Sequence, residues 1–412
     1  MRITHHGDCA IISNVANGKW IKLAKSDLAV FEVKSADELV EGMIASGVQH
    51  DDAEAFMEML AEYGFISGSV VDPSELSLRA TYLNITSRCN LACGHCYFGS
   101  APNLSDGLDT DGICALAQSV RDANVEGLVI SGGEPLVRPD FVSIMRFIAA
   151  LGFSEVTLLT NGTLMNSELA REIAACATNV HVSVDGPTEE VHALIRGRDN
   201  FERTIRGIEL LKDTGVASIR IITSVTSANI AELPRMRDLA DRLGASWGVS
   251  VFAAVGRGDR NAHLMPSIPD LVAFFREEIQ LLRCGFDGES GTTQCLEINA
   301  GVTCGSGIKM VSVDCFGNVF PCHLLHRPDL RIGNLAEQPN LKLMMSESPV
   351  ARAMQTRTVE SRACHGCMVE YFCKGGCLAH TIAHHNDSSN PWGERDPFCS
   401  LHRTVLGMQL WE

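Results

Sequence analysis

Cysteine is the residue type that stands out in this chain, which contains sixteen of them among 412 residues. Three lie close together, at Cys89, Cys93 and Cys96, in the segment RCNLACGHCYF. The opening segment MRITHHGD lacks the apolar core of a signal peptide, so we expect a cytoplasmic protein whose thiols stay reduced. Because grouped, reduced cysteines are suited to metal binding, the sequence predicts metal sites rather than disulfides.

The first cysteine group offers three thiolates on one short loop. Three thiolates can hold three irons of a cubane iron–sulfur cluster, and the fourth iron then keeps an open coordination position for a substrate or cosubstrate. A zinc ion is the alternative, because short cysteine spacings also suit zinc and His95 offers a fourth ligand. The spacing alone leaves both possibilities open.

A second and larger group lies in the last quarter of the chain. Its members are Cys304, Cys322, Cys364, Cys367, Cys373, Cys377 and Cys399. Gly375 and Gly376, in the segment CKGGC, allow the chain to fold tightly around a metal. A zinc ribbon would account for only part of this pattern, because it needs no more than four ligands.

The elements that must position the first group alternate between strand and helix from about residue 80 to 255. Strands are expected in TYLNIT, GLVISG, EVTLLT, VHVSVD, IRIITSV and WGVSVF, with helices over 139–150, 166–176, 201–214 and 230–243. This repetition predicts an α/β fold with a parallel sheet, open or curled into a partial (β/α)6 TIM-like barrel. Functional residues of such folds lie at the carboxyl ends of the strands.

Polar motifs stand at those strand ends. They are Ser131-Gly132-Gly133-Glu134-Pro135 after the second strand, Asn161 after the third, Ser183 and Asp185 after the fourth, and Arg196 beyond them. Glycines let a ligand approach the backbone, a carboxylate suits an ammonium, and a guanidinium suits a carboxylate. For Asp185 the alternative is that it caps the following helix.

In this order, the C-x3-C-x2-C loop and the strand-end motifs resemble the radical S-adenosylmethionine (SAM) superfamily. The resemblance implies that the first three cysteines hold a catalytic [4Fe–4S] cluster whose open iron binds the methionine part of SAM, and that reductive cleavage yields a 5′-deoxyadenosyl radical. It implies that residues 131–135 receive the methionine amino group. It also implies that His95 contacts adenine beside Tyr97, and that Ser183 and Arg196 hold the ribose or the carboxylate, near Asn161 and Asp185.

The seven later cysteines, with Gly317 between the first two, are similar to the SPASM domain of these enzymes, so we expect residues 256–412 to form a bridging region and an irregular two-cluster domain. The resemblance implies two auxiliary [4Fe–4S] clusters, and therefore three clusters in all. Cys304, Cys322 and Cys377 would bind the nearer one; Cys364, Cys367, Cys373 and Cys399 would bind the farther one. Cys295 or Cys315 could complete the nearer cluster, which otherwise has an open iron.

Residues 1–72 are expected to form a separate module. Asn17-Gly18 between two apolar segments predicts a hairpin, and helices follow it, which together favour a winged-helix-like shape. Five basic against twelve acidic residues argue against DNA binding by this module. It resembles the leader-peptide recognition element of maturases of ribosomally made natural products, in which a peptide would add a strand to the hairpin edge. A purely structural cap is the alternative.

The formal net charge of −16 also excludes a nucleic-acid partner for the whole chain, and no apolar run reaches membrane-spanning length. The resemblances together imply a maturase that takes a hydrogen from a precursor peptide and closes a thioether, C–C or C–O crosslink. An electron donor such as flavodoxin or ferredoxin would supply the catalytic cluster, and the auxiliary clusters would accept electrons. The alternatives are a maturase that oxidises a sulfatase to formylglycine, a peptide epimerase, and a non-enzymatic cluster protein. No side chain can be assigned as a catalytic acid or base.

Overall fold

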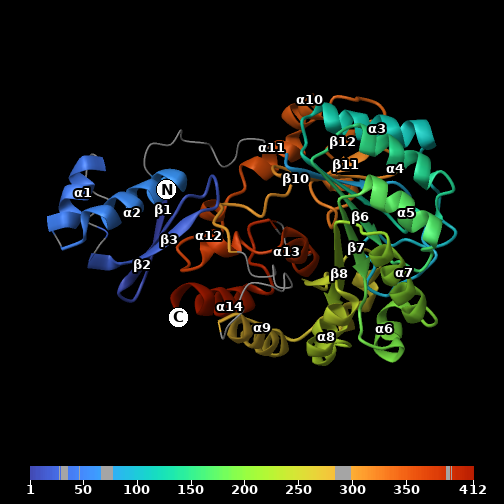
Figure 1. The fold of residues 1–412 in the computed structure, drawn as a ribbon. Coiled ribbons are helices and arrows are strands. Elements are labelled where there is room, and N and C mark those ends of the chain that lie inside the picture. Colours follow the sequence, from blue (N-terminus) through green and yellow to red (C-terminus); the bar gives the residue numbers. More distant parts are fainter. Residues whose placement is uncertain are drawn as a thin grey trace.

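The computed structural model describes residues 1–26, 28, 36–45, 47–65, 78–283, 298–386, 390 and 392–412. A small N-terminal sheet with two helices, a large sheet covered by helices, and an irregular C-terminal region between them are visible in Figure 1. Within the described part of the chain, no helix is long and apolar enough to span a bilayer.

Six neighbouring parallel strands form the predicted partial barrel. They are β4 (Ala80–Asn84), β5 (Gly127–Ser131), β6 (Glu155–Thr160), β7 (Asn179–Ser183), β8 (Ser218–Val225) and β9 (Ser246–Val251), in this order across the sheet. Each strand overlaps the segment predicted for it, because alternating or continuous β-branched residues such as Val180 and Val182, both fully buried, mark them. The predicted α/β fold class is confirmed.

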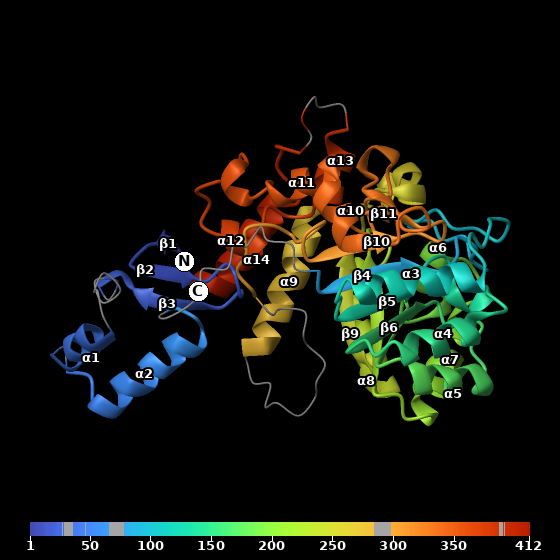
Figure 2. The same cartoon turned by 90° about the horizontal axis from the view of Figure 1, so that it is seen from above.

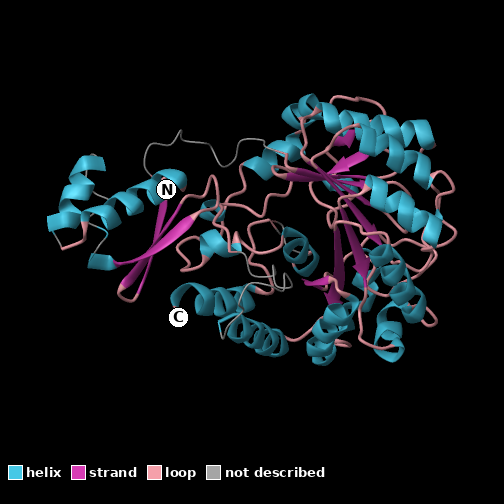
Figure 3. Cartoon of the chain, in the orientation of Figure 1, coloured by secondary structure: helices cyan, strands magenta, loops and turns pink. Residues whose placement is uncertain are grey.

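Helices cover the outer face of this sheet, as the cyan ribbons in Figure 3 show. They are α3 (Thr110–Asp122), α4 (Phe141–Ala150), α5 (Ser167–Cys176), α6 (Glu189–Arg196), α7 (Phe201–Asp213) and α8 (Leu233–Leu243). The four predicted helical segments correspond to α4, α5, α7 and α8, whereas α3 and α6 were not predicted. Fully buried side chains such as Ile113, Ile144 and Ile208 fasten the helices to the sheet, and each contributes about 1.5–3 kcal/mol by burial.

The barrel sheet does not end at β4. Strand β10 (Met310–Val313) pairs parallel with β4, and β11 (Asn318–Phe320) and β12 (Gly333–Asn334) continue it antiparallel. Gly317 makes the turn between β10 and β11 with φ of +87°, where a Cβ would lie 2.8 Å from Asn334 Oδ1. This explains the glycine in the C-terminal pattern. It also means that the segment carrying Cys322 is anchored to the barrel edge.

Beyond the barrel strands the chain continues with α9 (Ile268–Arg283), α10 (Leu341–Glu347), α11 (Pro349–Gln355), α12 (Glu370–Cys373), α13 (Leu378–His384) and α14 (Cys399–Trp411), and with the 3₁₀ helices η4 (Gly256–Leu264), η6 (Pro328–Leu330) and η7 (Val359–Ser361). Two further 3₁₀ helices, η2 (Pro135–Val137) and η3 (Ile230–Glu232), lie within the barrel. The four helices between α9 and α14 have seven residues or fewer, which is consistent with metal sites as structural supports of this region.

The N-terminal module consists of β1 (Arg2–His6), β2 (Cys9–Ser13), β3 (Trp20–Ala24), α1 (Ala36–Ala45) and α2 (His50–Glu62). The hairpin predicted around Asn17-Gly18 is confirmed: β2 and β3 are antiparallel and Gly18 has φ of +86°. Strand β1 was not predicted. The stretch 66–77, which contains the predicted boundary of the module, lies outside the described residues.

The N-terminal sheet packs on the C-terminal region, where the blue strands meet α12 and α14 in Figures 1 and 2. Trp20 meets Phe372 edge-on with ring centroids 5.5 Å apart, and its Nε1 donates to the carbonyl of Ile298 at 2.9 Å. The backbone N–H of Ala300 donates to the Gly18 carbonyl at 2.9 Å. The module is therefore fixed against the segment that carries Cys367 and Cys373, which belong to the same apolar cluster.

Candidate active site at the barrel mouth

A cavity of about 440 Å³ lies at the carboxyl ends of the barrel strands. Ten predicted site residues line it: Cys89, Cys93, His95, Cys96, Tyr97, Gly132, Gly133, Asn161, Ser183 and Arg196. The opposite wall includes Tyr82 from the first strand and His323 from the C-terminal region, which the sequence did not indicate. Glu134, Pro135 and Asp185 stand outside the lining set.

The cysteine loop is held in place by η4. Arg257 donates through Nη1 to the Cys93 carbonyl at 2.8 Å and through Nη2 to the Gly99 and Ser100 carbonyls at 3.1 and 2.5 Å. Asn261 Nδ2 donates to the Gly94 carbonyl at 3.0 Å. These contacts fix the loop backbone, so that it does not depend on bound metal alone. Arg257 was not predicted from the sequence, because a side chain that binds backbone carbonyls belongs to no ligand motif.

Hydrogen-bond donors or a guanidinium lie beside two of the three thiols. The N–H of Leu91 points to Cys89 Sγ at 3.4 Å, Asn161 Nδ2 lies 3.9 Å from it, and Arg196 Nη1 lies 4.0 Å from Cys93 Sγ. Burial raises the pKa of the Cys89 thiol to about 12, so a cation is needed to keep it ionised at neutral pH. Coordination to a metal deprotonates a thiol outright.

The spacing of the thiols separates the two metal possibilities. Tetrahedral zinc with bonds of about 2.3 Å would bring ligand sulfurs to within about 4 Å of one another. Among the described residues, no set of three cysteine or histidine ligands closes to within 4.8 Å; the one group that does is the exposed His50, Asp51 and Glu54 on α2. Cys89, Cys93 and Cys96 are not such a group, so their three sulfurs are not gathered around one point as a single zinc ion would require.

The glycines of the second strand-end motif are required by close backbone packing. A Cβ on Gly132 would lie 2.3 Å from the Thr86 carbonyl oxygen, and one on Gly133 would lie 1.9 Å from that of Arg88. Gly133 N–H and Glu134 N–H donate to these same carbonyls at 2.8 and 2.9 Å. The motif is thus locked to the strand that leads into the cysteine loop, and both glycines face the cavity.

Glu134 forms hydrogen bonds with residues at the end of the next strand, β6. Its Oε1 accepts a hydrogen bond from Thr160 Oγ1 and its Oε2 accepts one from the Asn161 N–H, both at 2.7 Å. The side chain is 1% exposed, and burial raises the pKa of its carboxyl group. Because the carboxylate is committed to these contacts, its role in this structure is to position Thr160 and Asn161 in the cavity wall.

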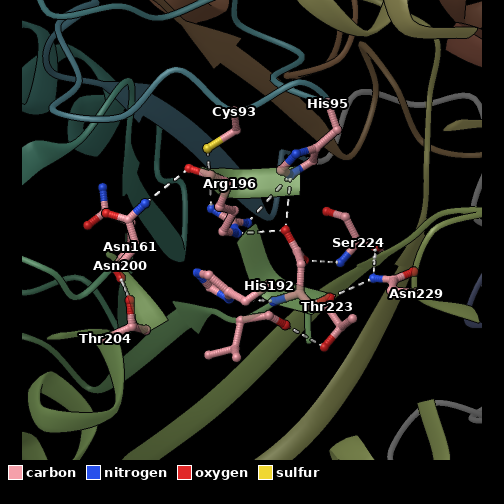
Figure 4. Close-up of polar contacts among 12 residues, drawn as sticks. Cys93, His95, Asn161, His192, Arg196, Asn200, Thr204, Thr223, Ser224 and Asn229 are labelled. Atoms are coloured by element: carbon pink, nitrogen blue, oxygen red, sulfur yellow. Dashed lines mark hydrogen bonds and ion pairs between the residues drawn. The ribbon is translucent and has the colours of Figure 1, made fainter. Parts of the chain in front are cut away.

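A buried ion pair stands beside the cysteine loop (Figure 4). Arg196 Nε donates to Asp185 Oδ2 at 2.6 Å, and His95 Nε2 lies 3.5 Å from both this oxygen and Arg196 Nη2. Asp185 Oδ1 accepts from the Ser224 N–H at 2.7 Å. Burial alone would raise the pKa of Asp185, but Arg196 and His95 outweigh it and the pKa is lowered. Asp185 does not cap α6, whose N-cap is Thr188.

His95 has one ring nitrogen left for a ligand. Burial lowers its pKa to about 4, so the ring is neutral at physiological pH. Its Nδ1 is buried and has no hydrogen-bond partner in the described part of the chain. A buried polar atom at a cavity wall is costly unless something satisfies it. A cosubstrate with donors and acceptors, such as adenine, fits this position.

The C-terminal cysteines gather in the two predicted sets. Electrostatic contacts link Cys304, Cys322 and Cys377 on one side, and Cys364, Cys367, Cys373 and Cys399 on the other. Gly376, in the loop between the sets, has φ of +72°, and a Cβ there would lie 2.2 Å from Asp396 Oδ2. That oxygen accepts the N–H of Cys377 at 2.5 Å, which places the thiol.

Of the two candidates for a further ligand, Cys315 lies elsewhere. It is fully buried in the main barrel core, its thiol interacts with Ser87, and its carbonyl accepts the N–H of Leu108 at 2.8 Å. Cys322 and Cys377 of the near set belong to a different apolar cluster. Cys295 lies outside the described residues.

An aromatic wall separates the cavity from the near thiol set. His323 stacks on Tyr82 with ring centroids 4.3 Å apart and meets Tyr97 edge-on at 5.3 Å. Its Nδ1 lies 3.6 Å from Cys322 Sγ. A single layer of side chains thus lies between the cavity and the thiol of Cys322.

Comparison with known proteins agrees with this geometry. The model of the Radical SAM superfamily matches residues 83–240, and that of the SPASM iron–sulfur cluster-binding domain matches residues 304–368. The chain belongs to the radical SAM superfamily and carries a SPASM domain: it is an iron–sulfur enzyme that uses SAM.

Among curated proteins, the mycofactocin maturase MftC of Mycobacterium ulcerans is 31% identical over 72% of this chain and 81% of its own length. The AdoMet-dependent heme synthase of Methanosarcina barkeri is 30% identical over 76% of this chain and 94% of its own. The subtilosin biosynthesis protein AlbA of Bacillus subtilis is 30% identical over 63% of this chain and 58% of its own.

Solved structures share the fold. Streptococcus suis SuiB bound to precursor peptide SuiA superposes with a TM-score of 0.64 at 15% identity over 97% of this chain and 100% of that one. The anSMEcpe structure with bound AdoMet gives 0.64 at 20% identity over 80% of this chain and 92% of that one. A match over 97% of the chain must include most of the N-terminal module.

Proposed function

We propose that this enzyme is a maturase that takes a hydrogen atom from a ribosomally made precursor peptide and closes an intramolecular crosslink, either a thioether or a C–C or C–O bond. The observation that carries the proposal is the single cavity bounded by the cysteine loop on one side and by the His323 wall before Cys322 on the other. Relatives named as a mycofactocin maturase and a subtilosin biosynthesis protein support a peptide substrate.

Cys89, Cys93 and Cys96 would hold the catalytic cluster. Together with bound SAM, this cluster would supply a 5′-deoxyadenosyl radical. Arg196, held by Asp185, is placed to bind the carboxylate of the methionine part, since its guanidinium lines the cavity next to Cys93. The backbone of Gly132 and Gly133 faces the position proposed for the amino group.

The adenosine part of SAM would lie along the other side of the cavity. His95 presents its ring to adenine beside Tyr97, while Asn161 and Ser183 line the wall proposed for the ribose. Pro135 is buried behind Gly133 and would act only by fixing the turn.

The two C-terminal thiol sets would hold two auxiliary [4Fe–4S] clusters, giving three in total. Forming a crosslink removes two hydrogens from the peptide; one goes to the adenosyl radical, and the other leaves as a proton and an electron. The aromatic wall of Tyr82 and His323 lies between the cavity and Cys322, where that electron would be accepted. Flavodoxin or ferredoxin would supply the electron that cleaves SAM.

The N-terminal module would bind the leader of the precursor by adding a strand to its sheet. Two observations support this: β1 and β3 are edge strands of a three-stranded sheet, and the module is fixed to the C-terminal region rather than tethered loosely. Each edge strand also contacts the C-terminal region at one end, β1 through Arg2 to Glu360 and β3 through Trp20 to Ile298. A leader strand added to either edge would therefore be short.

The test is coexpression with a short open reading frame encoded next to the gene, followed by mass spectrometry of the peptide. A crosslink gives the loss of two hydrogens, and the Cys93→Ala variant gives unmodified peptide. Unchanged mass with altered chirality indicates epimerisation and overturns the crosslink. Formylglycine on a sulfatase, or turnover of a tetrapyrrole in place of a peptide, rejects the peptide-crosslinking function. Protein that makes no 5′-deoxyadenosine from SAM is no radical enzyme.

A further inference from the structure

A lysine lies on the loop that joins the two C-terminal thiol sets. Lys374 follows Cys373 of the far set and precedes Cys377 of the near set. Its φ of +56° is uncommon for a residue with a side chain, and its N–H donates to the Glu370 carbonyl at 2.9 Å. In this left-handed backbone conformation, the side chain leaves the chain in a different direction from that of a residue in a strand or a right-handed helix.

The stem of Lys374 crosses to the segment of the near set. A Cβ on Gly301 would lie 3.3 Å from Lys374 Cε, and Gly301 is three residues from Cys304. The N–H of Gly301 donates to the Tyr371 carbonyl at 2.7 Å, which ties the two ligand segments together. Lys374 accordingly interacts electrostatically with Cys304 of one set and with Cys373 of the other.

A second cation, Arg357, also interacts with both thiol sets. Arg357 interacts with Cys304 of the near set and with Cys364 of the far set. Its guanidinium donates to the carbonyl of Trp392 and lies 5.4 Å from the centre of that ring. Two positively charged side chains thus interact with members of both thiol sets.

Within the ranges that the structure covers, Lys374 forms no ion pair with a carboxylate, and its strongest charged neighbour is a second cation, Lys309. The nearby Glu370 is already engaged by the His365 ring at 3.2 Å and by the Gly366 N–H at 2.9 Å. A half-buried ammonium without a counter-charge is unfavourable. Thiolates of an iron–sulfur cluster are negatively charged, and those of Cys304 and Cys373 interact with Lys374 and can compensate its charge.

We propose that Lys374, together with Arg357, holds positive charge near both auxiliary clusters and raises both reduction potentials, which stabilises the electron released by the substrate on either cluster as it passes from the near one to the far one. The inference rests on the proposed function, because it needs both clusters. In the step itself the near cluster loses one electron and the far cluster gains it, and no bond changes. Reduction adds a negative charge, which a neighbouring cation stabilises.

The test is a potentiometric titration of the anaerobically reconstituted full chain, followed by electron paramagnetic resonance. Lys374→Gln should shift the midpoint potentials of both auxiliary clusters to more negative values, whereas Lys374→Arg should keep them near those of the wild type. Lys374→Met, which keeps the apolar stem, should repeat the shift. Lys212→Gln is the control, since it removes one positive charge from the exposed last turn of α7 in the barrel part of the chain.

Iron and sulfide analysis comes first, because it tests whether the auxiliary clusters are present before the role of Lys374 is measured. Wild-type protein without auxiliary iron would refute the two-cluster function and this inference together. Auxiliary clusters whose potentials do not move in Lys374→Gln, or move equally in Lys212→Gln, would leave the proposed function intact and reject the role of Lys374.

Discussion

Asp185 Oδ2 accepts a hydrogen bond of 2.6 Å from Arg196 Nε, and this pairing holds the guanidinium 4.0 Å from Cys93 Sγ. Both side chains are buried, with the carboxylate fully enclosed. The pair thus connects the end of the fourth barrel strand to the cysteine loop, and it orients the one guanidinium that lines the cavity among the described residues.

Asp185→Asn should weaken SAM binding at least about tenfold, because Arg196 would lose the acceptor that orients it. Breaking a buried ion pair costs about 3–5 kcal/mol, so folding must be checked by circular dichroism before affinity is measured by calorimetry. Glu172→Gln is the control, since it removes a carboxylate paired with Arg146 at the surface. Equal affinities for wild type and Asp185→Asn would remove Arg196 from the carboxylate site.

The neutral state of His95 predicts a flat pH profile for SAM binding in mildly acidic solution. Burial lowers its pKa to about 4, below the usual 6.5, so the folded protein keeps the ring neutral between about pH 5.5 and 7. The unfolded chain takes up the proton first as pH falls, so this group destabilises the fold progressively below about pH 6.5. Calorimetry across this window checks the binding prediction; an inflection near pH 6.5 that disappears in His95→Gln would contradict it.

Arg257→Lys should reduce the iron content of the catalytic site, because lysine cannot donate at once to the carbonyls of Cys93, Gly99 and Ser100. We expect loss of about one to two of these hydrogen bonds, each worth about 1 kcal/mol, and a looser cysteine loop. Iron analysis and the resonance signal of the reduced catalytic cluster measure the effect. Arg260→Lys in the same element is the control, as Arg260 is exposed; equal iron in both variants would refute the anchoring role.

How far the sequence predicts this structure depends on the range of the interactions. The six barrel strands were predicted because runs such as EVTLLT carry their own pattern. Helix α3 was missed because Gly112 interrupts its first turn, and α6 because it has only eight residues. The pairing of β10 with β4 and the anchoring by Arg257 were not predictable, since each joins segments more than 150 residues apart and leaves no local signature.

Cys315→Ala should leave the iron content unchanged, whereas Cys322→Ala should lose about four irons. Cys315 is buried beside Ser87 in the barrel core, an apolar cluster separate from that of Cys322, so its removal creates a small cavity costing about 1 kcal/mol. Thermal unfolding should reveal this cost in an otherwise intact protein. Loss of iron from Cys315→Ala would instead make it a ligand of the near cluster.

Trp20→Ala should separate the N-terminal sheet from the C-terminal region without unfolding either. The substitution removes the edge-on contact with Phe372 and the hydrogen bond to the Ile298 carbonyl, together worth about 2–3 kcal/mol. Hydrogen exchange gives a local readout, because the Ala300 amide donates to the Gly18 carbonyl across this interface and should lose its protection. Trp20→Phe keeps the ring contact with Phe372 and should retain most of the protection of the Ala300 amide.

The same variant separates leader binding from leader delivery. If the module binds the leader on a strand edge and the interface only positions it, Trp20→Ala should keep its affinity for the precursor while the rate of modification falls about tenfold. The dithionite-driven yield of 5′-deoxyadenosine without precursor should not change, because the cavity lies in the barrel. Full modification rates despite an unprotected Ala300 amide would show that docking of the sheet has no part in presenting the peptide.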